Sequence, residues 1–75
     1  MRPVKRSFTI AGHKTSISLE AAFWDALREA AASEGLAVAR LVHKIDSERG
    51  AVNLSSAVRV WLLGYFKAAK AGPAA

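Results

Sequence analysis

The chain has 75 residues, contains no cysteine and carries a formal net charge of +5 at pH 7. A chain of this length forms one domain, and a core this small rarely contributes more than about 3–5 kcal/mol without disulfides, metals or oligomerisation. The lack of cysteine excludes disulfides, and only two histidines, thirty positions apart, could offer imidazole. We therefore expect no metal and no cofactor, and we expect the chain to gain stability as an oligomer.

The positive charge lies mainly at the N-terminal end. Residues 1–16 hold four Lys or Arg and no acid, whereas residues 17–75 hold seven Lys or Arg and six Asp or Glu. This asymmetry favours a polyanionic partner or an anionic membrane surface, with a solvated disordered tail as the alternative. Membrane binding is the weaker of the two, because the basic segment is predicted to be extended and not an amphipathic helix. No apolar run approaches the ~18 residues of a membrane span, and the basic end lacks the apolar segment of a signal peptide. We therefore expect a cytoplasmic protein without a membrane partner.

Residues 1–11 are interpreted as a basic arm that becomes extended. Apolar and hydroxyl side chains alternate from Arg6 to Ile10, which indicates a strand. Its apolar residues have even numbers, whereas those of the next segment have odd numbers. This change of parity needs a bend, and Gly12 permits the backbone angles of a turn. We predict two extended segments hinged near Gly12.

The second extended segment spans Lys14 to Leu19 and has two different faces. Thr15, Ile17 and Leu19 form a face that can be buried, and the other face is polar, with Lys14, Ser16 and Ser18. No partner strand is evident further along the chain. The pattern therefore predicts pairing with the same strand of a second copy.

Two helices follow. The first is predicted from Glu20 to Ser33, with Ser18 as a candidate cap, Gly35 as its end, and an inner stripe formed by Phe23, Leu27, Ala30 and Ala31. The second is predicted from Ala37 to Glu48, closed by Gly50, and its apolar residues follow helical spacing at Val38, Leu41, Val42 and Ile45.

A third helix is predicted from its cap at Asn53 to about Ala68, followed by a frayed tail at residues 70–75. It is apolar nearly all round, with Trp61 and Phe66 among its large side chains, which indicates an interface. Arg59 is expected to form an ion pair with an acid such as Asp46, with a phosphate contact as the alternative.

Residues from about Lys14 to Arg49 are predicted to form one short strand followed by two helices. The fuller pattern also includes the stretches Lys5-Arg6-Ser-Phe-Thr-Ile, Gly12-His-Lys-Thr-Ser and Asn53-Leu-Ser-Ser-Ala-Val-Arg59. The first pattern resembles the ribbon-helix-helix family of bacterial DNA-binding proteins, and the fuller one resembles a three-helix variant of that family. The resemblance implies a mainly α-helical domain over residues 12–69. In this fold the N-terminal strand pairs antiparallel across an intertwined homodimer, and here an extra C-terminal helix is added.

The resemblance also implies how DNA is bound, because a two-stranded ribbon fits the major groove. The groove-facing residues would be Lys14, Ser16 and Ser18, with Lys14 contacting guanine. Lys5 and Arg6 would contact phosphates or a minor groove, and His13 is included beside them, with a role in the turn as the alternative. The second helix would offer the backbone N–H groups of Leu36, Ala37 and Val38 to a phosphate. The core and dimer positions would be Thr15, Ile17, Leu19, Phe23, Leu27, Leu41, Val42, Ile45 and Trp61.

The function expected from these features is sequence-selective binding of double-stranded DNA by a nucleoid-associated transcriptional regulator, as a dimer or higher oligomer. No enzyme activity is expected, because the sequence has no Ser–His–acid set at a useful spacing and no Gly-rich phosphate loop. The alternative is a protein-interaction module of the same fold, antitoxin-like or a scaffold component, that binds a protein partner through the apolar third helix.

Overall fold

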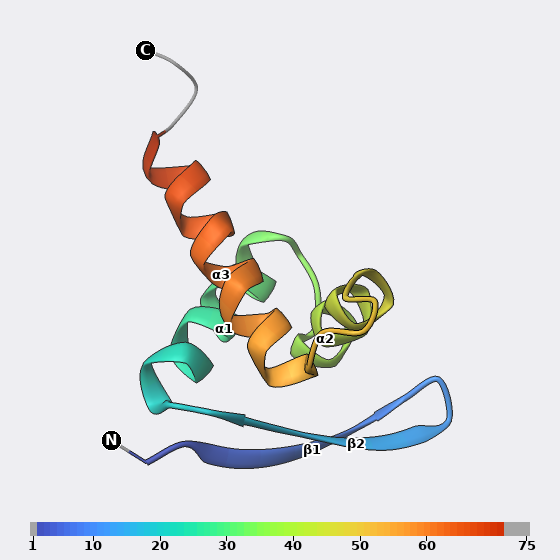
Figure 1. The fold of residues 1–75 in the computed structure, drawn as a ribbon. Coiled ribbons are helices and arrows are strands. Elements are labelled where there is room, and N and C mark those ends of the chain that lie inside the picture. Colours follow the sequence, from blue (N-terminus) through green and yellow to red (C-terminus); the bar gives the residue numbers. More distant parts are fainter. Residues whose placement is uncertain (1, 72–75) are drawn as a thin grey trace.

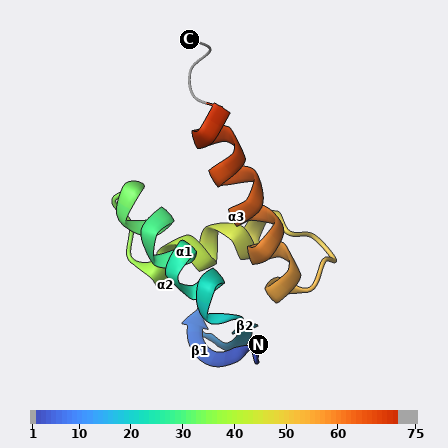
Figure 2. The same ribbon diagram turned by 90° about the vertical axis from the view of Figure 1, so that its left-hand side faces the viewer.

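The computed structural model describes residues 2–71 and contains a β-hairpin followed by three helices (Figure 1). The elements in chain order are β1 (Val4–Ile10), β2 (His13–Leu19), α1 (Ala21–Ser33), α2 (Val38–Glu48) and α3 (Leu54–Ala71). The hairpin lies on one side of the helices in both views, and α3 rises away from it toward the C-terminus (Figures 1 and 2).

The hairpin turn consists of Ala11 and Gly12, both with positive φ, at 51° and 81°. Two such residues in succession are the pattern of a type I′ turn, whose twist matches that of the strands it joins. The predicted hinge near Gly12 between two extended segments is therefore confirmed. The expected loose arm through Arg6 is shorter than predicted, because β1 already begins at Val4.

The partner strand of β2 differs from the one expected. The two strands of the same chain pair antiparallel over their full length, from Val4 opposite Leu19 to Ile10 opposite His13. One edge of β2 is therefore occupied by β1, so pairing between copies stays a prediction that only the other edge of β2 could satisfy. The sequence pattern missed this pairing because the partner strand lies before β2, in the segment interpreted as an arm.

Helix α1 starts one residue later than predicted and without the expected cap. Glu20 is the capping residue, and no side chain makes a capping hydrogen bond there. Ser18 instead uses its backbone N–H for a contact with α3. The helix ends at Ser33, and Gly35 follows with φ at +69°, as the predicted stop at this glycine requires.

Helices α2 and α3 follow the predicted pattern closely. Helix α2 begins at Val38 and ends at Glu48, next to Gly50 with its positive φ. The cap of α3 is confirmed, since the Ser56 N–H donates to the Asn53 side-chain oxygen over 3.3 Å. Helix α3 continues to Ala71, beyond the predicted end, and the remaining part of the predicted tail, residues 72–75, lies outside the described residues.

The core lies between the inner face of the hairpin and the three helices. Its buried residues are Ile10, Ile17, Leu19, Trp24, Leu27, Ala30, Ala31, Leu41, Val42, Ile45, Leu54, Val58 and Leu62. Burial of a Leu, Ile or Val side chain typically contributes about 1.5–3 kcal/mol, so this cluster holds the hairpin against the helices. Thr15, Phe23 and Trp61 are half-buried, and on α1 the neighbouring Trp24 is buried more deeply than Phe23.

Candidate nucleic-acid interface

The outer face of the hairpin is formed by both strands. Successive side chains of a strand point to opposite faces, and Ile17 and Leu19 point toward the core. The pairing register therefore places three cross-strand pairs on the opposite face, which we call the outer face: Lys5 with Ser18, Ser7 with Ser16, and Thr9 with Lys14. All of these residues are exposed except Ser18, which is half-buried.

This outer face is polar and cationic. It consists of two lysines, three serines and one threonine, and the hairpin from Val4 to Leu19 contains no acidic residue. The hydroxyl groups of Ser7 and Ser16 lie 3.3 Å apart and share a hydrogen bond across the strands. Lys5 and Lys14 are separated by four positions along the ribbon, or about 13 Å, so their charges lie toward its two ends.

Four of the six predicted DNA-binding residues share this face, namely Lys5, Lys14, Ser16 and Ser18. The other two, Arg6 and His13, occupy strand positions that alternate with those of the outer face. Arg6 lies on the helix-facing side, where its guanidinium carbon is 5.3 Å from the centre of the Trp24 ring. His13 is exposed beside the turn, opposite Ile10.

Ser7 and Thr9 also belong to the outer face, although sequence reasoning did not select them. The signal was present, because they alternate with Phe8 and Ile10 in the first extended segment. It became informative only once that segment was known to pair with β2, which brings Ser7 beside Ser16 and Thr9 beside Lys14.

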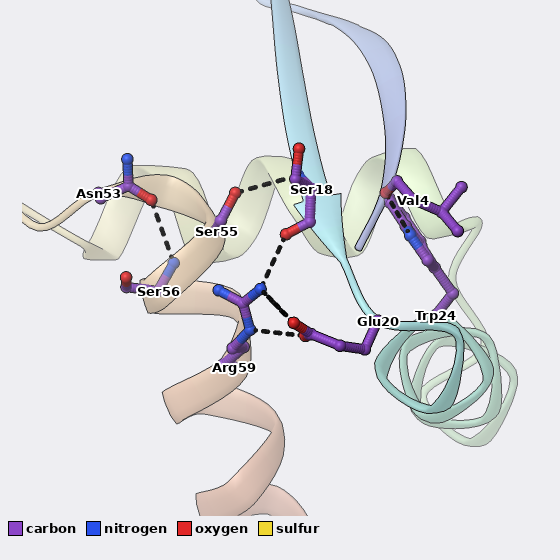
Figure 3. Close-up of polar contacts among 8 residues, drawn as sticks. All are labelled: Val4, Ser18, Glu20, Trp24, Asn53, Ser55, Ser56 and Arg59. Atoms are coloured by element: carbon purple, nitrogen blue, oxygen red, sulfur yellow. Dashed lines mark hydrogen bonds and ion pairs between the residues drawn. The ribbon is translucent and has the colours of Figure 1, made fainter. Parts of the chain in front are cut away.

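Helix α3 holds the end of β2 through an ion-pair cluster (Figure 3). The Ser18 N–H donates to the Ser55 hydroxyl over 3.1 Å, and the Ser18 carbonyl accepts from Arg59 Nη2 over 3.1 Å. The same guanidinium donates from Nε to Glu20 Oε1 over 3.0 Å and from Nη2 to Oε2 over 3.3 Å. Arg59 thus forms the expected ion pair, but with Glu20, because Asp46 is bound by Arg49 at 2.6 Å.

The pKa of Glu20 is lowered from its ordinary value. The main cause is a hydrogen bond to the Glu20 carboxylate from its own backbone, followed by the hydrogen bond and the positive charge of Arg59. The carboxylate is therefore ionised at neutral pH, and the adjacent guanidinium offsets its charge. The acid that follows β2 adds little net negative potential to the ribbon.

A second group of cations lies on the exposed side of α2. Leu36, Arg40, His43, Lys44 and Ser47 line a hollow of about 330 Å³. At the start of the helix, the Leu36 N–H already donates to the Ala31 carbonyl over 2.9 Å, so the prediction that it is available to a phosphate is wrong. Only Ala37 and Val38 of the predicted set keep that role as a proposal.

Helix α3 also presents an apolar surface, which we call the α3 patch, formed by Val60 and Leu63. Val60 is 68% exposed and Leu63 is 60% exposed. Two apolar grooves of about 350 Å³ each flank the patch. One runs along α1 and includes Phe23, Ala26, Leu62 and Phe66, and the other runs along α2 and includes Ile45, Val52, Ala57 and Trp61.

Two features are absent from residues 2–71. Within that range, no three His, Cys, Asp or Glu side chains are grouped so that they could hold a metal ion. No helix in the described part of the chain has the length and apolar character needed to cross a membrane.

Comparison with known proteins agrees with this architecture. A solved structure of an uncharacterized protein from Bordetella pertussis Tohama I superposes with a TM-score of 0.78 and is 38% identical in sequence. The match covers 96% of this chain but 63% of the Bordetella chain, so the present chain spans less than two thirds of that protein. No curated protein matches.

A family model described as the ribbon-helix-helix domain matches residues 3–66, which includes the hairpin and nearly all of the three helices. Proteins of this family are generally DNA-binding regulators that dimerise. The present chain belongs to the ribbon-helix-helix family.

Proposed function

We propose that this protein is a sequence-selective DNA-binding protein and acts as a transcriptional regulator, associated with the nucleoid in the cytoplasm. The observation that carries the proposal is the polar, cationic and acid-free outer face of the hairpin, on a ribbon whose other face is packed against the core. A two-stranded ribbon is narrow enough to enter the major groove, where base edges differ between the four base pairs.

Each proposed contact follows from side-chain chemistry. Lys14 would donate to guanine O6 or N7, and the hydroxyl groups of Ser16 and Ser18 can donate to or accept from base edges. Lys5, near the open end of the hairpin, would contact a phosphate. Arg6 and His13 lie off the outer face, so we assign them phosphates at the side and tip of the ribbon.

We further propose that the protein acts as a homodimer, with the α3 patch as the contact between copies. A two-fold interface must be self-complementary, and the patch combines a ridge, Val60 and Leu63, with apolar grooves on both sides that can receive the same ridge of a second copy. Charged residues also line the two grooves, with Arg59 in the first and Glu48 and Arg49 in the second. Higher oligomers would use the remaining edge of β2.

The test is a salt titration of duplex binding, first with sequences enriched from a randomised duplex pool and then with a scrambled duplex. The matched proteins are the wild type and a triple variant with Lys14→Ala, Ser16→Ala and Ser18→Ala. We expect the wild type to prefer the enriched sequence and the variant to lose that preference while keeping its helical circular dichroism. Because Lys14 is assigned to a guanine, the triple variant should keep most of the wild-type slope of log K against log salt, whereas Lys5→Ala, which removes a proposed phosphate contact, should reduce that slope by about 0.9. Absence of wild-type binding at low salt would contradict the proposal.

The second candidate is a protein-interaction module that uses the α3 patch for a different protein. The exposure of Val60 and Leu63 favours it, because large exposed apolar side chains side by side mark interaction surfaces. A monomeric wild type that ignores duplex DNA would support this candidate over the first.

A further inference from the structure

The ion pairs of the structure leave a group of cations on α2 without an acidic partner. Within residues 2–71, three acids are each bound by an arginine, in the pairs Glu20–Arg59, Asp25–Arg28 and Asp46–Arg49. No ion pair in the same range includes Arg40 or Lys44, and both are exposed. The near balance of charge over residues 17–75 therefore does not extend to this surface of α2.

Arg40, His43 and Lys44, which we call the α2 row, lie on one side of the helix. Together with Leu36 and Ser47 they line a hollow of about 330 Å³, and none of the five is acidic. The Ser47 hydroxyl already donates to the Lys44 carbonyl over 2.7 Å, so the polar side chains that remain for a partner are those of the row. Arg40 and Lys44 are about one turn apart, or about 6 Å along the helix axis, so both can contact the same charged strand.

The position of α2 places this row near the backbone of a duplex bound by the hairpin. Helix α2 lies on the same side of the hairpin as the other helices and contacts β1 (Figure 1). Its first residue, Val38, lines a hollow of about 410 Å³ together with Ser7 and Phe8 of β1. The major groove is about 8.5 Å deep, and a helix with its side chains is about 10–12 Å thick. When the outer face of the hairpin enters the groove, α2 therefore lies level with the phosphates that border it.

We propose that the α2 row binds phosphates of the DNA strand that borders the groove. This inference rests on the DNA-binding function proposed above and adds a second contact surface to it. The guanidinium of Arg40 and the ammonium of Lys44 pair with phosphate charges, and a ring N–H of His43 donates a hydrogen bond. Because phosphates are the same in every sequence, the row raises affinity without changing the base preference of the hairpin.

The experiment compares two charge-matched variants on the enriched and scrambled duplexes over a range of salt concentrations. The α2 variant carries Arg40→Gln and Lys44→Gln. The α3 variant carries Lys67→Gln and Lys70→Gln, which removes two exposed cations from the part of α3 that lies away from the hairpin (Figure 1). Both variants lower the net charge by the same amount, and Gln retains the helix preference, so long-range attraction falls equally in both. Circular dichroism and thermal unfolding verify the fold of each variant.

We expect the α2 variant to reduce the slope of log K against log salt by about 1.8, at about 0.9 for each of two lost phosphate contacts, and the α3 variant to keep the wild-type slope. The ratio of the affinities for the two duplexes should stay the same in both variants. Ethylation interference locates the contacts, because some phosphates whose ethylation weakens binding by the wild type should no longer do so for the α2 variant.

Equal slopes in the α2 and α3 variants would overturn the inference, and the proposed function would stand as long as the wild type prefers the enriched duplex. A loss of base preference in the α2 variant would also overturn it, since the row would then contact base edges. A wild type that binds neither duplex would overturn both the inference and the proposed function.

Discussion

Glu20 and Arg59 join the hairpin to α3 through one carboxylate and one guanidinium. The pKa of Glu20 is lowered in the folded protein, so ionised Glu20 stabilises the folded state more than protonated Glu20 does. The stability that this carboxylate contributes is therefore fully present above its ordinary pKa of 4.5 and is lost as the pH falls through the lower folded value. Urea unfolding should show the wild type losing stability below pH 4.5 more steeply than Glu20→Gln.

The matched control for this prediction is Glu29→Gln, which changes an exposed carboxylate on α1. At pH 7, Glu20→Gln should be less stable than the wild type, and the stabilities of the two proteins should converge as the pH falls below the lowered folded pKa of Glu20. Parallel stability curves for the wild type and Glu20→Gln over this range would contradict the assignment of the acid-sensitive contact.

Single residues also show what the sequence could not supply. The helical stripe of α1 was placed on Phe23, but Trp24 is the buried residue, because its indole N–H donates to the Val4 carbonyl over 2.8 Å and its ring stacks on Phe8. Helical spacing allows either neighbour to face inward, and the choice depends on a strand twenty residues away. The partner of Arg59 was missed for the same reason, since Glu20 lies 39 positions from it.

At the scale of elements, the hairpin turn holds Ala11 in a strained backbone conformation that a substitution could relieve. Ala11 has φ at 51°, a left-handed conformation in which its Cβ crowds the backbone, whereas Asn adopts it more readily. Ala11→Asn creates an Asn-Gly pair, the preferred sequence of a type I′ turn, and should stabilise the protein by about 0.5–1 kcal/mol. Gly12→Ala, with φ at 81°, should destabilise it by about 1 kcal/mol or more. Chemical denaturation measures both, and a stabilising Gly12→Ala would refute the turn type.

The contact between α3 and β2 can be tested at the level of one amide. Ser55→Ala removes the acceptor of the Ser18 N–H, at a cost of about 1 kcal/mol, so hydrogen exchange at the Ser18 amide should accelerate. Ser56→Ala alters the neighbouring exposed hydroxyl on α3 and provides the control. Unchanged exchange at Ser18 in the Ser55 variant would show that α3 does not protect this strand edge.

These elements also explain which parts of the fold were predictable. Both strands, the hinge at Gly12, the cap at Asn53 and the stops at Gly35 and Gly50 depend on neighbours within a few residues, and the structure agrees with them. The pairing of β1 with β2 was not predictable in the same way. The alternation of apolar and polar side chains along each strand shows which face is buried, but it does not show which strand lies next to which. Once paired, the same alternation defines the whole outer face.

For the whole molecule, the proposed equilibrium between monomer and dimer depends on the α3 patch. Val60 and Leu63 expose 68% and 60% of their surface, so they contribute little to the fold of a single chain. In a symmetric dimer, four such side chains would be buried, each contributing about 1 kcal/mol. The double variant Val60→Gln and Leu63→Gln keeps the charge and the helix preference. It should therefore weaken dimerisation by at least about 100-fold, with little change in monomer unfolding.

Sedimentation equilibrium over a range of protein concentrations measures this effect, with Ala32→Gln and Ala39→Gln as controls at exposed sites on α1 and α2. Duplex binding by the same variants then separates two roles of the dimer. If the reading surface is assembled from two chains, the monomeric variant should lose its base preference together with the dimer. If the variant keeps that preference and loses only the added affinity of a second linked copy, one chain reads the duplex. A patch variant that remains dimeric would instead place the contact between copies at the edge of β2 that does not pair with β1.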